Sequence, residues 1–169
     1  MKPACRAIAT AVSWLLMSAT PALAQSFERG TTSLALMLGA AEQLQRNYTL
    51  VSGRAGYYFA DDVEASVALE GWFGNDPKIY KLIPELRYVY SAPRAVKPYA
   101  AGFVARSFYQ GGSVADVNSY GARVGAYFPL GRRSFLGLGL VHERFKDCDP
   151  QVYGDCRQTF TELSLHFVF

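Results

Sequence analysis

The sequence lacks features that several large classes of protein require. No segment beyond residue 24 has an unbroken apolar run of about 18 residues, so membrane-spanning helices are excluded from that part of the chain. Charge of one sign is also missing, because 17 basic residues face 14 acidic ones; no nucleic-acid partner is expected, since such binding depends on a basic surface. Cysteine and histidine are rare, with three and two copies, and they indicate no metal and no cofactor.

The first 24 residues have the organisation of a secretory signal peptide. Lys2 and Arg6 give a basic start, an apolar stretch follows over 7–17, and Ala22-Leu23-Ala24 is a small-residue cleavage pattern. We therefore predict a cleaved signal peptide over 1–24 and one mature domain over 25–169. If this domain spans a membrane, a closed β-barrel is the remaining way to satisfy its backbone hydrogen bonds.

The mature chain alternates apolar and polar residues with the period of a β-strand. The last strand shows this best, since Glu162, Ser164 and His166 alternate with apolar residues and the chain ends on Phe169. Connections are mostly short and long in turn, which is typical of outer-membrane barrels. We predict an all-β fold, an eight-stranded antiparallel up-and-down transmembrane β-barrel, with strands at 32–40, 48–59, 63–73, 80–90, 98–108, 119–128, 135–145 and 162–169.

The polar faces of these strands distinguish a membrane barrel from a soluble one. A soluble lipocalin-like barrel would place the apolar faces inside, whereas here glycine and alanine accompany the charges, leaving room for long side chains in a narrow interior. Charges confined there must pair with one another, because an unpaired buried charge is costly. The predicted lumen charge network, which would plug the barrel, comprises Arg54, Glu64, Glu70, Glu85, Arg87, Arg106, Arg123, Glu143 and Glu162.

Aromatic residues gather near the strand ends, where amphipathic rings favour the membrane interfaces. The inner rim is predicted to hold Tyr57, Phe59, Tyr88, Tyr90, Tyr99, Phe128, Phe135 and Phe169. The outer rim is predicted to hold Trp72, Phe73, Tyr80, Phe108, Tyr109, Tyr120 and Phe145.

The terminal strand and the segment Lys97-Pro98-Tyr99-Ala100-Ala101-Gly102 resemble the small outer-membrane β-barrel families: the OmpA membrane domain, OmpX-like proteins and the opacity-type porin family. The resemblance covers the whole mature chain. It implies location in the bacterial outer membrane, contact with outer-membrane lipid and lipopolysaccharide, and an assembly signal at Phe167 and Phe169 that the barrel-assembly machinery reads during insertion.

Ser164 and His166 lie on one face with Glu162, the residue types of a hydrolase triplet. Same-face neighbours on a strand are about 7 Å apart at the backbone, whereas a nucleophile and its base need hydrogen-bond reach. The chain is similar in size to the lipid A deacylase family, but the His-x-Ser of that family is absent, because neither His142 nor His166 is followed two places later by serine. No catalytic residue is predicted.

Cys148 and Cys156 are expected to form a disulfide in the external loop over 146–161. An oxidising compartment favours the bond, which would contribute about 2–4 kcal/mol by restricting the unfolded chain. The alternative, a metal site, lacks further cysteine or histidine ligands nearby.

His142, Arg144 and Lys146 continue the lipid-facing register of the seventh predicted strand toward the outside. Two interpretations stay open for them. They either contact lipopolysaccharide phosphates or extend to the interface with no specific partner.

These observations predict a monomeric, non-enzymatic outer-membrane barrel that serves envelope integrity or surface interaction through its loops. The alternative is a small-solute, porin-like channel, and the third candidate is a lipid A-modifying enzyme. The sequence identifies no surface ligand.

Overall fold

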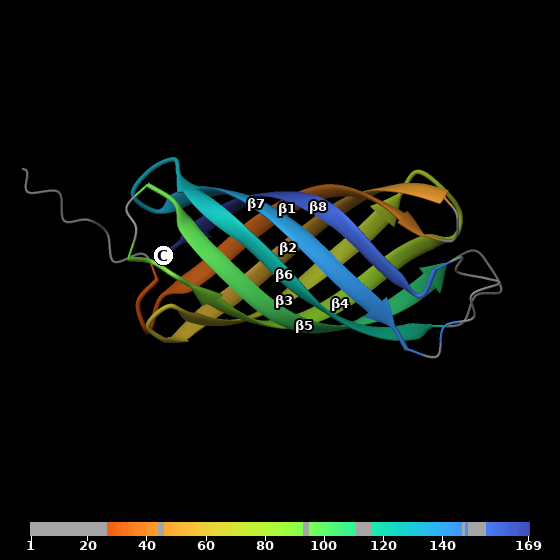
Figure 1. The fold of residues 1–169 in the computed structure, drawn as a ribbon, viewed down its shortest axis with the longest axis horizontal. Coiled ribbons are helices and arrows are strands. Elements are labelled where there is room, and N and C mark those ends of the chain that lie inside the picture. The colour runs from red at the N-terminus through yellow and green to blue at the C-terminus, as the bar shows by residue number, and fades with distance from the viewer. Residues whose placement is uncertain (1–26, 44–45, 93–94, 111–115, 147, 149–154) are drawn as a thin grey trace, which may run out of the picture.

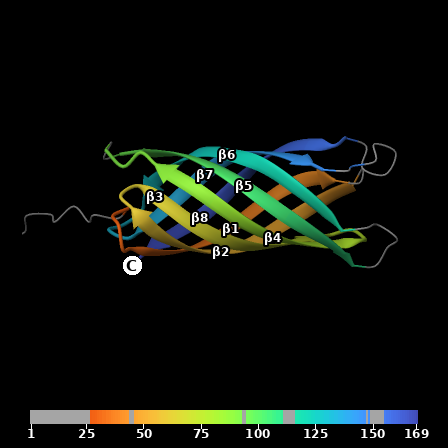
Figure 2. The same ribbon diagram turned by 90° about the horizontal axis from the view of Figure 1, so that it is seen from below.

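The computed structural model describes residues 27–43, 46–92, 95–110, 116–146, 148 and 155–169. Eight strands form a closed barrel in sequence order, and β1 pairs with β8 in the register Leu36↔Leu165 to complete it (Figures 1 and 2). The predicted fold class is confirmed. The predicted signal peptide lies outside the described residues and stays a prediction. The strands are β1 Thr32–Gln43, β2 Arg46–Ala60, β3 Val63–Phe73, β4 Lys78–Val89, β5 Lys97–Gln110, β6 Val117–Pro129, β7 Ser134–Phe145 and β8 Arg157–Val168.

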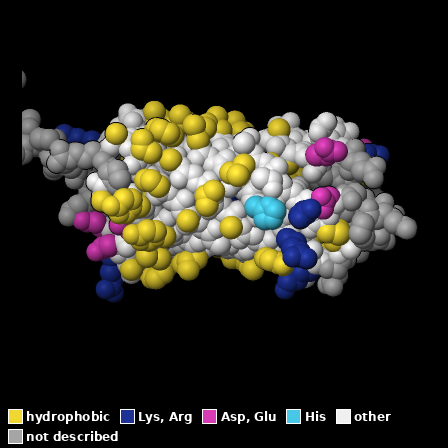
Figure 3. Space-filling view, in the orientation of Figure 1, with side chains coloured by type: hydrophobic (Ala, Val, Ile, Leu, Met, Phe, Trp, Pro, Cys, Tyr) yellow, Lys and Arg dark blue, Asp and Glu magenta, His cyan; other side chains and the backbone are white. Residues whose placement is uncertain are grey.

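Strand alternation explains why this sequence closes into a barrel with an apolar outside. Along β4 every second residue is buried, so that Lys81, Glu85 and Arg87 point into the lumen while Leu82 and Leu86 point outward. Large apolar side chains are exposed over most of the outer wall (Figure 3). None of the described residues forms a helix long and apolar enough to cross a membrane.

We call the end that carries Phe27 and Phe169 the inner end and the opposite end the outer end (Figure 1). Strand β8 begins at Arg157, five residues earlier along the chain than the predicted start at Glu162. In the first five residues of β8, polar Arg157, Thr159 and Thr161 point outward and Phe160 points inward. The prediction missed residues 157–161 because it looked for outward apolar residues. This part of β8 extends beyond the apolar band of the barrel, where outward residues can be polar.

Among the described residues the lumen contains three apolar clusters, of which the smallest, Val117 and Phe145, lies at the outer end. The cluster near the inner end consists of Phe27, Tyr58, Val89, Tyr99, Tyr127, Phe135 and Val168, and the cluster toward the outer end includes Tyr48, Trp72, Ile79, Phe103 and Phe160. Four aromatic residues that were predicted at the rims are therefore wrongly placed, because their side chains are buried in the barrel: Trp72, Tyr99, Phe135 and Phe145.

Glycines on β6 make space for these rings. A Cβ on Gly121 would lie 2.5 Å from Phe103 Cζ, and one on Gly125 would lie 2.6 Å from the Tyr99 hydroxyl oxygen. Both distances are shorter than any ordinary carbon contact. The glycines thus accommodate aromatic rings in the lumen, in addition to the long charged side chains that the sequence led us to expect.

The segment preceding β1 folds across the inner end of the barrel. The Asp62 backbone N–H donates to the Phe27 carbonyl over 2.7 Å, and the Gly30 N–H donates to the Tyr58 carbonyl over 2.7 Å. Gly30 has φ +93°, a left-handed conformation that glycine adopts without a steric penalty. The ring of Phe27 is 3% exposed and lies 5.0 Å from the ring of Phe135 and 5.7 Å from that of Tyr58.

Candidate functional site

Three arginines converge on one carboxylate in the middle of the lumen. Glu85 on β4 lies 3.2 Å from Arg54 Nη1 on β2, 2.5 Å from Arg87 Nη2 on its own strand and 2.8 Å from Arg123 Nε on β6. All four side chains are almost completely buried. Strand alternation explains their meeting, because each residue occupies an inward position and the barrel is narrow enough for opposite walls to touch.

The other carboxylates in this region hold the same arginines in place. Arg123 Nη1 also pairs with Glu162 on β8, and Arg87 Nε lies 4.0 Å from Glu64 on β3. Neutral groups complete the arrangement. The Tyr127 hydroxyl accepts hydrogen bonds from Arg87 and, over 3.1 Å, from Arg54, and the Tyr99 hydroxyl donates to Glu162 over 3.2 Å.

A second ion pair lies nearer the outer end. Lys81 Nζ on β4 is 2.8 Å from Glu143 Oε2 on β7, and Ser119 and Gln158 donate to the same carboxylate over 2.5 and 2.6 Å. Lys81 Nζ also lies 4.2 Å from the centre of the Trp72 ring, whose indole N–H donates to Glu70 over 2.7 Å. Buried charges thus have partners on several strands, as the cost of an unpaired buried charge requires.

Arg106 is not part of this network, and its predicted position is wrong. It pairs in register with outward-facing Leu82, its side chain is 55% exposed, and it lies 3.7 Å from the Asp116 carboxylate. The buried residues of β5 that point inward are Tyr99, Ala101, Phe103, Ala105 and Ser107. Both faces of this strand carry small and apolar residues, so Arg106, the only charge within the predicted range 98–108, did not reveal which face is inward.

Lys81 takes the place that the sequence analysis gave to Arg106. Lys81 is an even number of residues from Glu85 and Arg87 on the same strand, so strand alternation would have placed it on their inward face. Among the described residues, the buried charged side chains of the lumen are Arg54, Lys81, Arg87 and Arg123 with Glu64, Glu70, Glu85, Glu143 and Glu162.

The hydrolase-type residues lie inside this packed region. Ser164 is 3% exposed and His166 is fully buried. His166 Nδ1 lies 3.2 Å from Arg54 Nη2, and the His166 ring is 4.8 Å from that of Tyr127. A cation, and not the serine, therefore lies against Nδ1 of the imidazole. No three His, Cys, Asp or Glu side chains of the described ranges are grouped so as to hold a metal ion.

A second charged region lies on the outer wall, and we call it the outward basic cluster: Arg106, Arg144, Lys146 and Arg157. All four side chains are exposed and occupy outward positions of β5, the β7 end and β8. Figure 3 shows basic side chains and the histidine gathered toward the outer end of this wall, beyond the apolar surface. His142, one position inward of Arg144 on this face, is bonded through Nδ1 to Thr159 Oγ1 over 2.8 Å.

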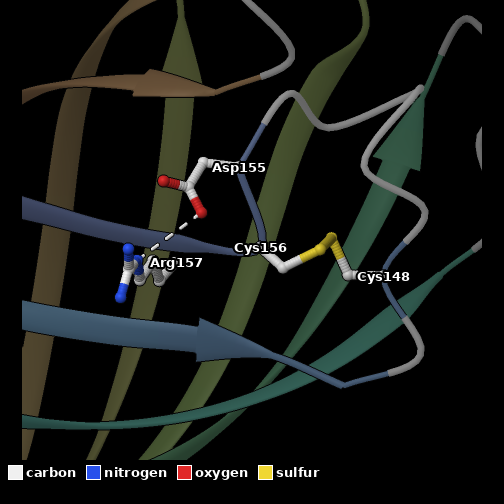
Figure 4. Close-up of a disulfide and its surroundings, with 4 residues drawn as sticks. All are labelled: Cys148, Asp155, Cys156 and Arg157. Carbon is white, nitrogen blue, oxygen red and sulfur yellow. Dashed lines mark ion pairs between the residues drawn. A yellow bond between two sulfur atoms is a disulfide. The ribbon is translucent and has the colours of Figure 1, made fainter.

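The disulfide between Cys148 and Cys156 is present, with 5.7 Å between the two Cα atoms, and this prediction is confirmed (Figure 4). The disulfide joins the segment after β7 to the residue before β8. The two strands are also held together there by a hydrogen bond from the Phe145 N–H to the Cys156 carbonyl over 2.9 Å. Arg157 directly follows Cys156 and lies 3.7 Å from the Asp155 carboxylate (Figure 4).

The terminal residues named as an assembly signal lie at the inner end. Phe167 and Phe169 point outward, and Phe169 exchanges backbone hydrogen bonds with Thr32 over 2.9 and 3.2 Å. The closing strand thus begins its pairing with β1 at this aromatic residue.

No protein-family model matches the sequence, and none of the curated proteins compared with it matches either. Among solved structures, the chain is similar to the N-terminal β-barrel domain of Pseudomonas aeruginosa OprF, with 15% identity, a TM-score of 0.62 and coverage of 83% of this chain and 98% of that one. Neisserial surface protein A gives 15% identity, a TM-score of 0.60 and coverage of 82% and 96%. The outer membrane protein OprG from Pseudomonas aeruginosa gives 12% identity, a TM-score of 0.50 and coverage of 86% and 99%.

These likenesses define the fold of the chain. It is that of the small eight-stranded outer-membrane β-barrels. The neighbours are bacterial outer-membrane proteins, which supports an outer-membrane location for this chain.

Proposed function

We propose that this protein is a non-enzymatic outer-membrane barrel, monomeric and closed to solutes, that contributes to envelope integrity and presents its external loops at the cell surface. The observation that carries the proposal is the convergence of Arg54, Arg87 and Arg123 on Glu85 in the middle of the lumen. A continuous water path would have to pass these buried side chains. Each cation is held by short contacts, so moving one aside would leave a charge without its partner.

The inner end adds a second obstruction. Phe27 packs against the inner cluster, and Lys97 Nζ lies 5.6 Å from the centre of its ring. A solute that passed the arginines would next meet this aromatic layer. The two obstructions lie at different heights, so the proposal does not depend on either one alone.

Conductance of the purified full-length mature protein in planar lipid bilayers tests the closed lumen. We expect no discrete current steps above those of the protein-free bilayer. A Glu85→Ala/Arg123→Ala variant, which empties part of the middle layer, is the matched positive control, provided that it folds. Discrete steps from the wild-type protein would overturn the closed lumen and favour the small-solute channel.

Assembly is the second part of the proposal. Phe169 is exposed at the inner end and starts the β1–β8 pairing, the position expected for a signal that the barrel-assembly machinery reads. Phe169→Ala should lower the folded yield in outer-membrane fractions, measured by heat-modifiable mobility on gels. Phe128→Ala, which removes an exposed ring from a different strand at the same end, serves as the control. Normal folded yield for Phe169→Ala would contradict this part.

A further inference from the structure

We propose that the outward basic cluster binds the phosphate groups of an outer-leaflet glycolipid of the lipid A type, whose acyl chains lie against the apolar wall beneath. This inference rests on the outer-membrane location in the proposed function and is independent of the closed lumen. It assigns one side of the barrel, the wall formed by β5 to β8, as a lipid-binding surface.

The pairing registers place the cluster as a compact patch. Arg144 on β7 lies directly opposite Arg157 on β8, and on its other side it faces Tyr120 on β6. Arg106 on β5 faces Asn118 on β6, whose carbonyl accepts a hydrogen bond from the Lys146 backbone over 2.8 Å. The four cations thus occupy two adjacent rows of outward positions across neighbouring strands.

The direct opposition of Arg144 and Arg157 is unfavourable in the protein alone. Like charges at facing positions of antiparallel strands destabilise the pair. Their Cβ atoms are about 4.5–5.5 Å apart in such positions, a spacing at which one phosphate reaches both guanidinium groups. An anion between them would convert a repulsion into two charge-assisted hydrogen bonds.

Among the described residues, carboxylates satisfy this patch poorly. The described acidic groups paired with it are Asp116, 3.7 Å from Arg106, and Asp155, 3.7 Å from Arg157, and both pairs are largely exposed. Exposed ion pairs of this kind contribute about 0–1 kcal/mol. Within the described residues, no ion pair engages Arg144 or Lys146, although Lys146 Nζ lies 5.9 Å from the Tyr120 ring centre. The described carboxylates therefore leave most of the positive charge of the cluster open to an external anion.

The position along the barrel selects a lipid as the source of that anion. On β7 the outward residues Leu138 and Leu140 precede His142 and Arg144, so the cations begin where the apolar band ends. On β5 outward Val104 precedes Arg106, and the next outward residue is the aromatic Phe108, whose ring centre lies 5.7 Å from the Arg106 guanidinium carbon. The phosphates of an outer-leaflet glycolipid lie at this boundary between acyl chains and headgroups, and cations there are favourably placed to meet them.

The wall beneath offers a surface for the acyl chains. Nearer the inner end than the cluster, strands β5 to β8 present exposed apolar side chains: Val104 on β5, Val124 on β6, Leu138 and Leu140 on β7 and Leu163 on β8. Acyl chains that extend from phosphates bound at the cluster would lie along these residues.

The test measures binding of a lipid A that carries two phosphates to the purified full-length mature barrel in a neutral detergent, by native mass spectrometry. Arg144→Gln/Arg157→Gln should weaken binding about tenfold or more, since charged hydrogen bonds are lost. The control Arg132→Gln/Arg133→Gln removes the same charge from exposed positions at the inner end and should leave affinity unchanged. Heat-modifiable mobility confirms that each variant is folded.

Two further arms identify the ligand. The same lipid A with its phosphates removed should bind wild type about as weakly as the intact lipid binds the Arg144/Arg157 variant. Inorganic phosphate should not displace the lipid, because it has no acyl chains to contact the wall. Unchanged affinity in the cluster variant, an equal loss in the control, or strong binding of the dephosphorylated lipid would each overturn the proposal. Full competition by inorganic phosphate would overturn the assignment to a lipid.

The result is separable from the conductance test. A barrel that conducts ions yet loses lipid through Arg144→Gln/Arg157→Gln would refute the closed lumen and support the lipid site. A barrel that shows no conductance, and whose lipid A affinity is unchanged by Arg144→Gln/Arg157→Gln, would support the closed lumen and refute the lipid site.

Discussion

The lumen and the outward basic cluster use the same kind of residue in opposite ways. In the lumen, Arg123 lies 2.8 Å from Glu85 and also pairs with Glu162, with almost no exposure to solvent. On the outer wall of the neighbouring strand, Arg144 faces Arg157 across the ladder and is exposed. Both arginines belong to the sheet, but only the first is surrounded by carboxylates from its own chain.

This difference indicates which charges serve the fold and which are available to a partner. A buried charge is tolerated only when the fold supplies its counter-charge, because desolvation is costly. An exposed charge needs no such partner, and like charges at facing positions reduce stability. The inner arginines should therefore be essential for stability, and the outer ones dispensable for it.

The largest effect should come from Arg123→Met. Removing this guanidinium leaves Glu85 and Glu162 with fewer partners in a buried site, and we expect the free energy of unfolding to fall by about 3–5 kcal/mol. Arg144→Met, the outward counterpart on the adjacent strand, should change it by no more than about 0.5 kcal/mol. Urea titrations followed by heat-modifiable mobility measure both. An equal loss of unfolding free energy in the two variants would indicate a hydrated, screened lumen, and would contradict the proposed difference between inner and outer arginines.

A second experiment asks whether the inner charges act as pairs. Lys81→Met leaves the buried Glu143 with two donors among the described residues, Ser119 and Gln158, and should lower the free energy of unfolding by about 3 kcal/mol. The double variant Lys81→Met/Glu143→Gln removes both charges and should recover most of this loss, because the unpaired charge is the main cost. The same urea titration distinguishes the cases. Strictly additive losses would show that the two residues act independently.

The disulfide lies at the outer end of β7 and β8, next to Arg157 of the outward basic cluster. Cys148→Ser/Cys156→Ser should leave the barrel able to fold, because the ladder hydrogen bonds do not depend on the bridge. The free energy of unfolding should fall by about 2 kcal/mol, the scale for a short loop. Lipid A affinity should fall as well, since the bridge restrains the end of the β7–β8 ladder, where Arg157 faces Arg144. A variant that fails to fold would show that the bridge is required for the barrel itself.

Sequence reasoning located the strands because alternation has a strict period of two in a barrel wall. Among the described residues, it placed eight of the nine buried charges of the lumen, since most of them share a face with small or polar neighbours. It failed at Arg106 and Lys81 for physical reasons. On β5 both faces are mostly apolar, so one charge does not show which face is inward. Lys81 lies close to the predicted strand start, where the polar residues of the preceding loop obscure the alternation.

Other features needed three-dimensional contacts. Phe27 precedes the first strand and has no periodic signal, and only its packing against Tyr58 and Phe135 assigns it to the lumen. The outward basic cluster combines β5, β7 and β8, so its members are distant in sequence. Arg157 was not predicted as part of it because the strand that carries it was expected to begin later.

The smallest expected effect is also the sharpest test of the cluster. Asp155 is the carboxylate closest to Arg157 among the described residues, at 3.7 Å with both side chains largely exposed. If a lipid phosphate competes with this carboxylate, Asp155→Asn should raise lipid A affinity by about two- to threefold, consistent with the small free energy of an exposed ion pair. The stability of the barrel should not change. Asp61→Asn, an exposed carboxylate at the inner end, is the control for a general change in net charge. An equal gain in both variants would mean that long-range charge, and not the local competition at Arg157, sets the affinity.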